Sequence, residues 1–299
     1  MKPVFIGSGV ALITPFDKDG KIDFKGFEKL IEHKIENKTD AIIVCGTTGE
    51  GSTLTVYERL NLFSTAVEIA RGRVPVIGGT GSNSTSFSLS LIKEAEKTGI
   101  DAHLSVTPYY NKTSQEGLIK HYYALAEKAE KPIIVYNVPS RTGMNITPET
   151  YKALSEHNNI CGVKEADSNI AKLIKSVKLC GEKLDFYIGN DDMICPAIAC
   201  GCKGVISVLA NIMPGFTHEM ATEGINGNTE KCRKMQEEVI ELVGALFCDV
   251  NPIPVKFAMK HMGMDTGVLR LPLCEMSEEK QQRLIKCMEI IKNTDTLIN

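Results

Sequence analysis

Lys164 is the residue whose surroundings most favour chemistry. It follows an apolar, strand-like run at residues 160–163, whereas most other lysines lie beside glutamates on helical faces or at turns. Burying an ammonium is costly and lowers the lysine pKa, and the neutral amine can attack a carbonyl to form a Schiff base. The alternative is a structural ion pair with Glu165, which the opposite orientation of adjacent strand residues disfavours. Position alone leaves both interpretations open.

Tyr136 is the second candidate. It lies near the end of the strand-like run that precedes the run of Lys164, so on neighbouring strands the phenol and the amine would face the same end of a sheet. A phenol can shuttle protons during imine and enamine formation if another group relays its proton. Thr47 or Thr48, which follow an earlier run, could serve as that relay. The alternatives are a half-buried structural tyrosine and threonines that cap or terminate elements.

Eight short runs rich in valine and isoleucine must position these residues. The runs are almost continuously apolar, which is typical of parallel strands covered on both faces. They begin at residues 9, 41, 74, 102, 132, 160, 185 and 204. In parallel α/β barrels the active site lies where the strands end, and the candidate residues lie at the ends of these runs.

Segments with helical periodicity separate the runs. Apolar stripes begin at Phe24 and Val56, and Thr55 predicts a capping box at the start of the second stripe. Ser168, just before the stripe at residues 170–177, predicts a further helix start.

This alternation predicts an α/β protein of the (β/α)8 TIM-barrel class. We assign residues 1–224 to a catalytic barrel and residues 225–299 to a C-terminal helical extension, with helical patterns near 230–246, 255–262 and 278–292. A doubly wound sheet is the alternative. It lacks its usual signatures, because no G-x-G-x-x-G follows the first run and no G-x-x-x-x-G-K-[ST] occurs.

The composition argues against nucleic-acid and membrane partners. The chain has 299 residues, of which 43% are hydrophobic, and a formal net charge of −3. This charge provides no basic field for nucleic acid, and no apolar run is long enough to cross a membrane. The first residues lack the pattern of a signal peptide. We therefore expect a cytoplasmic protein without nucleic-acid or membrane partners.

Disulfide and metal sites have little support. The ten cysteines form no C-x-x-C pair, and we interpret them as reduced, mostly buried residues. Cys200 and Cys202 have no nearby histidine to complete a zinc site. Asp191 and Asp192 are a weak metal alternative and are better interpreted as caps of the following helix. The residues thus predict a lysine-dependent aldolase or lyase for a small carbonyl compound, without a metal.

Four segments resemble those of a known family. They are GTTGE at residues 46–50, TPYYN at 107–111, YNVPSRTG at 136–143 and GVKEA at 162–166. In this order and spacing they are similar to segments of the pyruvate-dependent class I aldolase/lyase superfamily, and within it of the dihydrodipicolinate synthase family. The resemblance implies condensation of pyruvate with L-aspartate 4-semialdehyde to give 4-hydroxy-tetrahydrodipicolinate, the first committed step of lysine and diaminopimelate biosynthesis.

The resemblance also implies catalytic roles. Lys164 would form the pyruvate Schiff base, so that no separate cofactor is expected. Tyr136 would donate and accept the proton, with Thr47 and Tyr110 completing a proton relay. Tyr110 would reach into the site of a neighbouring subunit, within a homotetramer built as a dimer of tight dimers.

Three further residues would bind the substrates. Thr48 and Ile206 would hold the carboxylate and carbonyl of pyruvate through backbone or hydroxyl groups. Arg141 would meet the carboxylate of the semialdehyde, a role that suits a bidentate guanidinium.

Alternatives within the superfamily are N-acetylneuraminate lyase and the keto-deoxy sugar acid aldolases, which share the lysine and tyrosine. Sialic acid lyases usually carry Ser-Thr in the G-x-T-G-E segment and lack the arginine. Thr47 before Thr48, together with Arg141, therefore favours the synthase. A non-catalytic barrel that only binds a keto acid or a partner protein is the alternative from another class.

We predict little or no feedback inhibition by lysine. In well-known inhibited members of the family, lysine is held by two histidines just after GTTGE and by a glutamate four residues after an asparagine. The corresponding residues here are Val56, Arg59 and, after Asn83, Phe87. Without the carboxylate that pairs with the ligand's ammonium, lysine should bind much more weakly. Initial rates measured with added lysine should therefore stay unchanged, and inhibition at sub-millimolar lysine would contradict this prediction.

Overall fold

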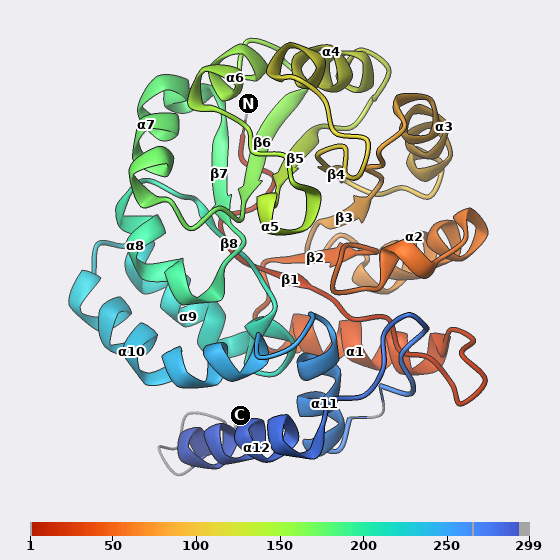
Figure 1. The fold of residues 1–299 in the computed structure, drawn as a ribbon, viewed down its shortest axis with the longest axis vertical. Coiled ribbons are helices and arrows are strands. Elements are labelled where there is room, and N and C mark those ends of the chain that lie inside the picture. The colour runs from red at the N-terminus through yellow and green to blue at the C-terminus, as the bar shows by residue number, and fades with distance from the viewer. Residues whose placement is uncertain (1, 265, 293–299) are drawn as a thin grey trace.

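Eight parallel strands close into a barrel in chain order, with β1 paired to β8 (Figure 1). The structure, a computed structural model, describes residues 2–264 and 266–292. All eight predicted strands are confirmed, and the doubly wound alternative is wrong because the sheet is closed. The strands are β1 (Gly7–Ala11), β2 (Ala41–Val44), β3 (Val76–Gly79), β4 (Ala102–Val106), β5 (Ile133–Asn137), β6 (Ile160–Glu165), β7 (Asp185–Ile188) and β8 (Gly204–Ser207).

Helices surround the barrel, and within the described part of the predicted extension three more helices follow it (Figure 1). The surrounding helices are α1 (Phe24–Glu36), α2 (Val56–Ala70), α3 (Thr85–Glu96), α4 (Gln115–Ala126), α5 (Pro139–Thr142), α6 (Pro148–Leu154), α7 (Ile170–Cys180), α8 (Ile194–Ala199) and α9 (Pro214–Ile225). The extension holds α10 (Thr229–Leu246), α11 (Ile253–His261) and α12 (Glu278–Lys292). Short 3-10 helices are η1 (Gly51–Thr53), η2 (Gly181–Lys183), η3 (Asp191–Met193) and η4 (Leu209–Asn211).

The starts of the helices agree only in part with the sequence pattern. The capping box at Thr55 is confirmed at the start of α2. The cap of α7 is Asn169 rather than Ser168, because the Asn169 side chain accepts a backbone N–H of the first helical turn. Phe24 and Val56 begin the two predicted stripes but remain 39% and 38% exposed. Each is the first residue of its helix.

Two apolar layers form the core. The larger layer lies between the strands and the surrounding helices, and the smaller layer fills the inside of the barrel. Alternate residues of each strand contribute to the two layers, since successive side chains point to opposite faces. Tyr136 and Ile206 belong to the inner layer, so both point into the barrel.

The extension is attached to the barrel through buried charges. Nζ of Lys256, on α11, lies 2.8 Å from Oε1 of Glu50, and both side chains are buried. The backbone N–H of Arg270 donates to Oε2 of the same glutamate at 3.1 Å. Glu50 belongs to the GTTGE segment after β2, so the extension is fixed directly to one of the loops at the barrel mouth. A buried pair of this kind is strongly destabilising to break.

The predicted division after residue 224 stays a prediction, although α9 ends one residue later, at Ile225. Residues 265 and 293–299 of the predicted extension lie outside the described residues. Among the helices that the structure describes, none is both long and apolar enough to span a membrane. The ten cysteines are free, and five of them are buried: Cys45, Cys161, Cys180, Cys202 and Cys232.

Candidate active site

Tyr136 and Lys164 are neighbours across two strands. Tyr136 on β5 pairs with Lys164 on β6, and Lys164 pairs in turn with Tyr187 on β7. Paired residues of adjacent strands point to the same face of the sheet. Nζ of Lys164 lies 4.6 Å from the centroid of the Tyr136 ring. The closed barrel therefore brings together the two residues that the sequence singled out.

The Lys164 amine is buried and has a lowered pKa. The residue is 6% exposed, and its burial lowers the pKa of the amine to about 8. The Asp191 carboxylate raises this pKa, and the Arg141 charge lowers it by a smaller amount. Gly189, after β7, leaves room for the side chain, because a Cβ at that position would lie 2.9 Å from Cε of Lys164. The amine is thus partly neutral near neutral pH.

Glu165 has its own partners on the other side of the strand. Its carboxylate accepts from Nδ2 of Asn137 at 2.7 Å and from the hydroxyl of Tyr151 at 2.7 Å. Nζ of Lys172, on α7, lies 3.2 Å from the same carboxylate. These contacts exclude the structural interpretation in which Lys164 pairs with Glu165.

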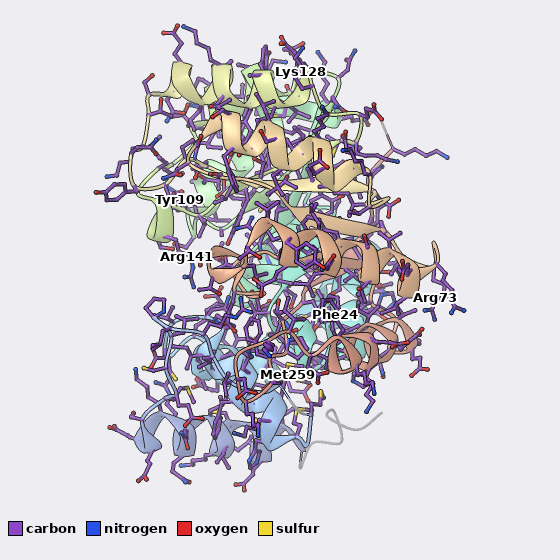
Figure 2. All side chains as sticks on the ribbon, turned by 90° about the vertical axis from the view of Figure 1, so that its right-hand side faces the viewer. Phe24, Arg73, Tyr109, Lys128, Arg141 and Met259 are labelled. Carbon is purple, nitrogen blue, oxygen red and sulfur yellow. The ribbon has the colours of Figure 1, made fainter. Side chains whose placement is uncertain are left out.

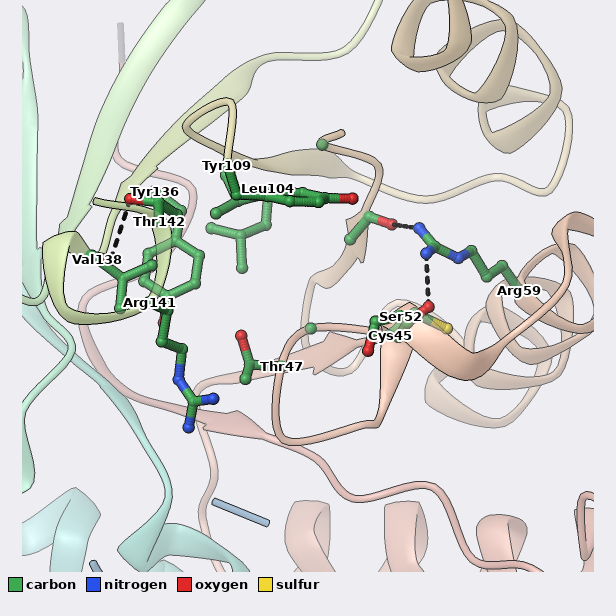
Figure 3. A pocket seen from close by; sticks show the side chains of 15 residues that line it. Cys45, Thr47, Ser52, Arg59, Leu104, Tyr109, Tyr136, Val138, Arg141 and Thr142 are labelled. Atoms are coloured by element: carbon green, nitrogen blue, oxygen red, sulfur yellow. Dashed lines mark hydrogen bonds between the residues drawn. The ribbon is translucent and has the colours of Figure 1, made fainter. Parts of the chain in front are cut away.

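The Tyr136 phenol is buried and keeps its proton. Burial raises the pKa of Tyr136, while the Arg141 charge and a hydrogen bond with Thr47 act in the opposite direction. Figure 3 shows Thr47, Tyr136 and Arg141 on one side of a cavity, with Arg59 on the other. The phenol therefore stays protonated at neutral pH, and Thr47 lines the same cavity.

Two cavities meet at Tyr136 and Arg141. The larger, of about 610 Å³, is lined by Thr48 and Lys164 and extends outward to α10. The smaller, of about 320 Å³, passes Thr47 (Figure 3). A substrate in the larger cavity can therefore touch the amine, the phenol and the guanidinium together.

Thr48 and Arg141 share one unexpected partner. Nδ2 of Asn251 donates to Oγ1 of Thr48 at 2.9 Å, and Nη2 of Arg141 donates to the backbone carbonyl of Asn251 at 3.2 Å. Asn251 lies between α10 and α11 and lines the larger cavity. Sequence reasoning missed it, because an Asn-Pro pair after a helix indicates only a turn.

Asp191 does not cap the following helix, and that expectation is wrong. It is 1% exposed, and its Oδ2 accepts the backbone N–H groups of Val208 and Leu209 at 2.9 and 3.0 Å. The carboxylate therefore bonds to the segment that follows β8 and not to the start of the helix. Ile206 lies on β8, just before this segment, and is fully buried.

Tyr110 is not part of the cavity in the single chain. It is 92% exposed, with a backbone φ of 69°, whereas its neighbour Tyr109 lines the smaller cavity. In Figure 2, Tyr109 and Arg141 lie near one end of the barrel and Arg73, which follows α2, lies near the other. The two cavities are lined by five of the other six candidate residues, namely Thr47, Thr48, Tyr136, Arg141 and Lys164, whereas Ile206 lies in the core inside the barrel.

No group of three or more histidine, cysteine, aspartate or glutamate side chains is placed to hold a metal ion within residues 2–264 and 266–292. Asp191, the weak metal candidate, has its Oδ2 occupied by backbone N–H groups. The expected absence of a metal remains a prediction.

A closed (β/α)8 barrel with a buried lysine of lowered pKa at its mouth defines a Schiff-base-forming aldolase or lyase. The family model for the dihydrodipicolinate synthetase family matches residues 4–291. The chain belongs to this family.

Individual relatives agree with this assignment. The chain is 47% identical over 291 residues to a 4-hydroxy-tetrahydrodipicolinate synthase of Clostridium novyi, covering 97% of this chain and 98% of the relative. It is 50% identical over 283 residues to a synthase of the same name from Thermoanaerobacter sp., covering 94% and 95%.

Solved structures are similar over the whole chain. The dihydrodipicolinate synthase of Acinetobacter baumannii complexed with pyruvate superposes with a TM-score of 0.94 at 40% identity, covering 98% of this chain and 99% of that one. A monomeric dihydrodipicolinate synthase variant gives a TM-score of 0.95 at 40% identity, covering 99% and 98%.

We predict that Lys164 reacts as an amine with a pKa of about 8. Its acetylation by acetic anhydride at increasing pH should rise through pH 8, because the neutral fraction grows there. Asp191→Asn should move this midpoint to lower pH, since the lost carboxylate had favoured the ammonium. Mass spectrometry of the Lys164 peptide measures the reaction, and exposed lysines of the same digest are the control. A midpoint near that of the exposed lysines would contradict the prediction.

Proposed function

We propose that the protein joins pyruvate to Lys164 as a Schiff base and condenses it with L-aspartate 4-semialdehyde to give 4-hydroxy-tetrahydrodipicolinate. This is the first committed step of lysine and diaminopimelate biosynthesis. The observation that carries the proposal is the Lys164 amine, buried beside Tyr136 in the large cavity of a chain that belongs to the dihydrodipicolinate synthetase family.

The first step is attack of the neutral amine on the carbonyl carbon of pyruvate. With a pKa of about 8, roughly a tenth of Lys164 is neutral at pH 7, whereas an ordinary lysine is neutral to roughly 0.04%. The addition forms the C–N bond, and the carbinolamine then loses water to leave an iminium. Thr48 and the backbone near Ile206 hold the carboxylate and carbonyl oxygens of pyruvate during this step.

Tyr136 moves the protons. It protonates the leaving hydroxyl of the carbinolamine and later takes a proton from the methyl carbon to give the enamine. Thr47 lines the same cavity as the phenol and passes the proton on to Tyr110. An iminium on Lys164 withdraws electrons from the methyl carbon, so the chemistry needs no metal and no further cofactor.

The second substrate enters through the outer part of the cavity. Arg141 lines this part and pairs with the carboxylate of the semialdehyde. The enamine carbon attacks the aldehyde carbon. The new C–C bond forms as the C=O π bond breaks, and the aldehyde oxygen takes the proton of Tyr136. The amino group of the semialdehyde then attacks the iminium carbon and closes the ring, Lys164 leaves as the free amine, and the proton released from the ring nitrogen returns to Tyr136.

A partner subunit completes the proton relay. Tyr110 is 92% exposed, and the aromatic side chains of Tyr57, Phe87 and Tyr109 are also exposed, at 75%, 41% and 39%. We infer that they contribute to one interface. A patch of exposed aromatic side chains is typical of a protein interface. Pairing of this surface in a tight dimer lets Tyr110 reach the neighbouring Thr47, and two such dimers form the homotetramer.

The reaction is tested by trapping the imine. Incubation with pyruvate and borohydride should inactivate the enzyme and add a pyruvate-derived mass to Lys164, and Lys164→Ala should show no adduct. Tyr136→Phe should lower kcat by roughly a hundredfold or more, because a general acid–base group is lost.

Parallel assays separate the two enzyme alternatives. The protein should consume pyruvate with L-aspartate 4-semialdehyde in a coupled assay and should not cleave N-acetylneuraminate. An adduct on another lysine would overturn the mechanism, and cleavage of N-acetylneuraminate alone would favour the sialic acid lyase.

The shared site is tested by mixing two inactive variants. Lys164→Ala lacks the amine, and Tyr110→Phe lacks the hydroxyl that acts in the neighbouring site, so each should lose most activity. Mixed dimers contain one site with both groups, and the mixture should regain part of the activity. Sedimentation velocity should show dimers or tetramers. A fully active monomer, or no recovery on mixing subunits that do exchange, would contradict the proposal.

A further inference from the structure

Asn251 connects two substrate-binding residues that are far from it in sequence. Its side-chain Nδ2 donates to Oγ1 of Thr48, 203 residues away, and its backbone carbonyl accepts from Nη2 of Arg141, 110 residues away. The residue is 7% exposed and lines the larger cavity. The segment between α10 and α11 therefore contributes directly to the barrel mouth.

The contact with Thr48 restricts where the threonine proton can point. A hydroxyl carries one proton and two lone pairs, and its O–H rotates to suit its neighbours. In this site the side-chain amide of Asn251 donates to a lone pair of Thr48 Oγ1. The Thr48 O–H therefore does not donate to Asn251. Thr48 also lines the cavity that holds the Lys164 amine. Its proton is thereby left free for an anionic group in that cavity.

We propose that Asn251 is a positioning residue for pyruvate: it orients the Thr48 hydroxyl as a donor to the pyruvate carboxylate. This inference rests on the proposed function, in which Thr48 holds that carboxylate. A hydrogen bond to a carboxylate is stronger than one between neutral groups, and it requires the donor to be aligned before the substrate arrives.

The two ends of Asn251 act on different substrates. The side chain reaches Thr48 and thus pyruvate, whereas the backbone carbonyl reaches Arg141 and thus the semialdehyde. A substitution removes the first contact and retains the second. A specific positioning role therefore changes the KM for pyruvate much more than the KM for the semialdehyde, whereas general loosening of the extension raises both.

The experiment measures the pyruvate concentration that gives half-maximal borohydride trapping on Lys164, which requires only the first half of the reaction. Asn251→Ala should raise this concentration roughly tenfold, through loss of one aligned hydrogen bond to a charged group. Asn251→Asp keeps the shape but should raise it further, because its carboxylate would accept the Thr48 proton and repel pyruvate. In the coupled assay, the KM for the semialdehyde should change less than about threefold, because the backbone carbonyl that Arg141 contacts is retained.

A double-mutant cycle tests whether the effect passes through Thr48. Thr48→Val removes the hydroxyl, and adding Asn251→Ala to it should change the pyruvate dependence by less than about twofold, because coupled residues are not additive. Lys256→Met is the matched control, since it breaks the other attachment of the extension to the GTTGE segment. It should lower the thermal stability without the tenfold change in pyruvate dependence.

The outcomes separate this inference from the proposed function. Failure of the wild-type protein to trap pyruvate on Lys164 would overturn the proposed function. Normal trapping with an unchanged pyruvate dependence in Asn251→Ala, or an undiminished effect in the Thr48→Val background, would overturn only the role of Asn251. An equal change in Lys256→Met would do the same. Where thermal unfolding shows that Asn251→Ala does not fold, the isosteric Asn251→Asp decides by the same criterion.

Discussion

Burial of the Lys164 amine is the constraint on which the rest of the site depends. A lysine in the barrel interior has a lowered pKa and gains reactivity from the same burial that makes it costly. Asp191 limits this effect without an ion-pair contact, because its Oδ2 is held by backbone N–H groups after β8. Glu165 is occupied on the other face of β6. The pKa of the amine is therefore lowered towards neutral pH, and neither carboxylate forms an ion pair with it.

The closed sheet provides the alignment that this amine needs. Register places Tyr136 beside Lys164, and strand ends from β2 to β8 add Thr47, Thr48 and the segment after Ile206. The extension adds what the barrel lacks. Its buried Lys256 holds Glu50 of the GTTGE segment, and Asn251 meets Thr48 in the same segment. Two contacts of different chemistry thus fix one loop at the mouth, where loops are otherwise the mobile part of such a fold.

Features with a local physical cause were predictable from the sequence. The eight strands follow from continuous apolar runs, and the capping box at Thr55 follows from a three-residue spacing. The burial of Lys164 follows from its place after an apolar run. Predictions failed where a distant segment competes for a side chain. Asp191 was expected to cap a helix, but backbone N–H groups after β8 lie close enough to take its carboxylate.

The sequence by itself determined the order of strands and helices, the burial of the lysine and the likeness of four segments to one family, because each depends on residues close together in the chain. Only the tertiary structure decided which side chains meet. Asn251 bonds to Thr48 across 203 residues, and Tyr110 is exposed whereas Tyr109 lines the smaller cavity. These outcomes depend on closure of the barrel and docking of the extension. Both bring together groups that lie far apart in the sequence, so that the residues around one group give no indication of the other.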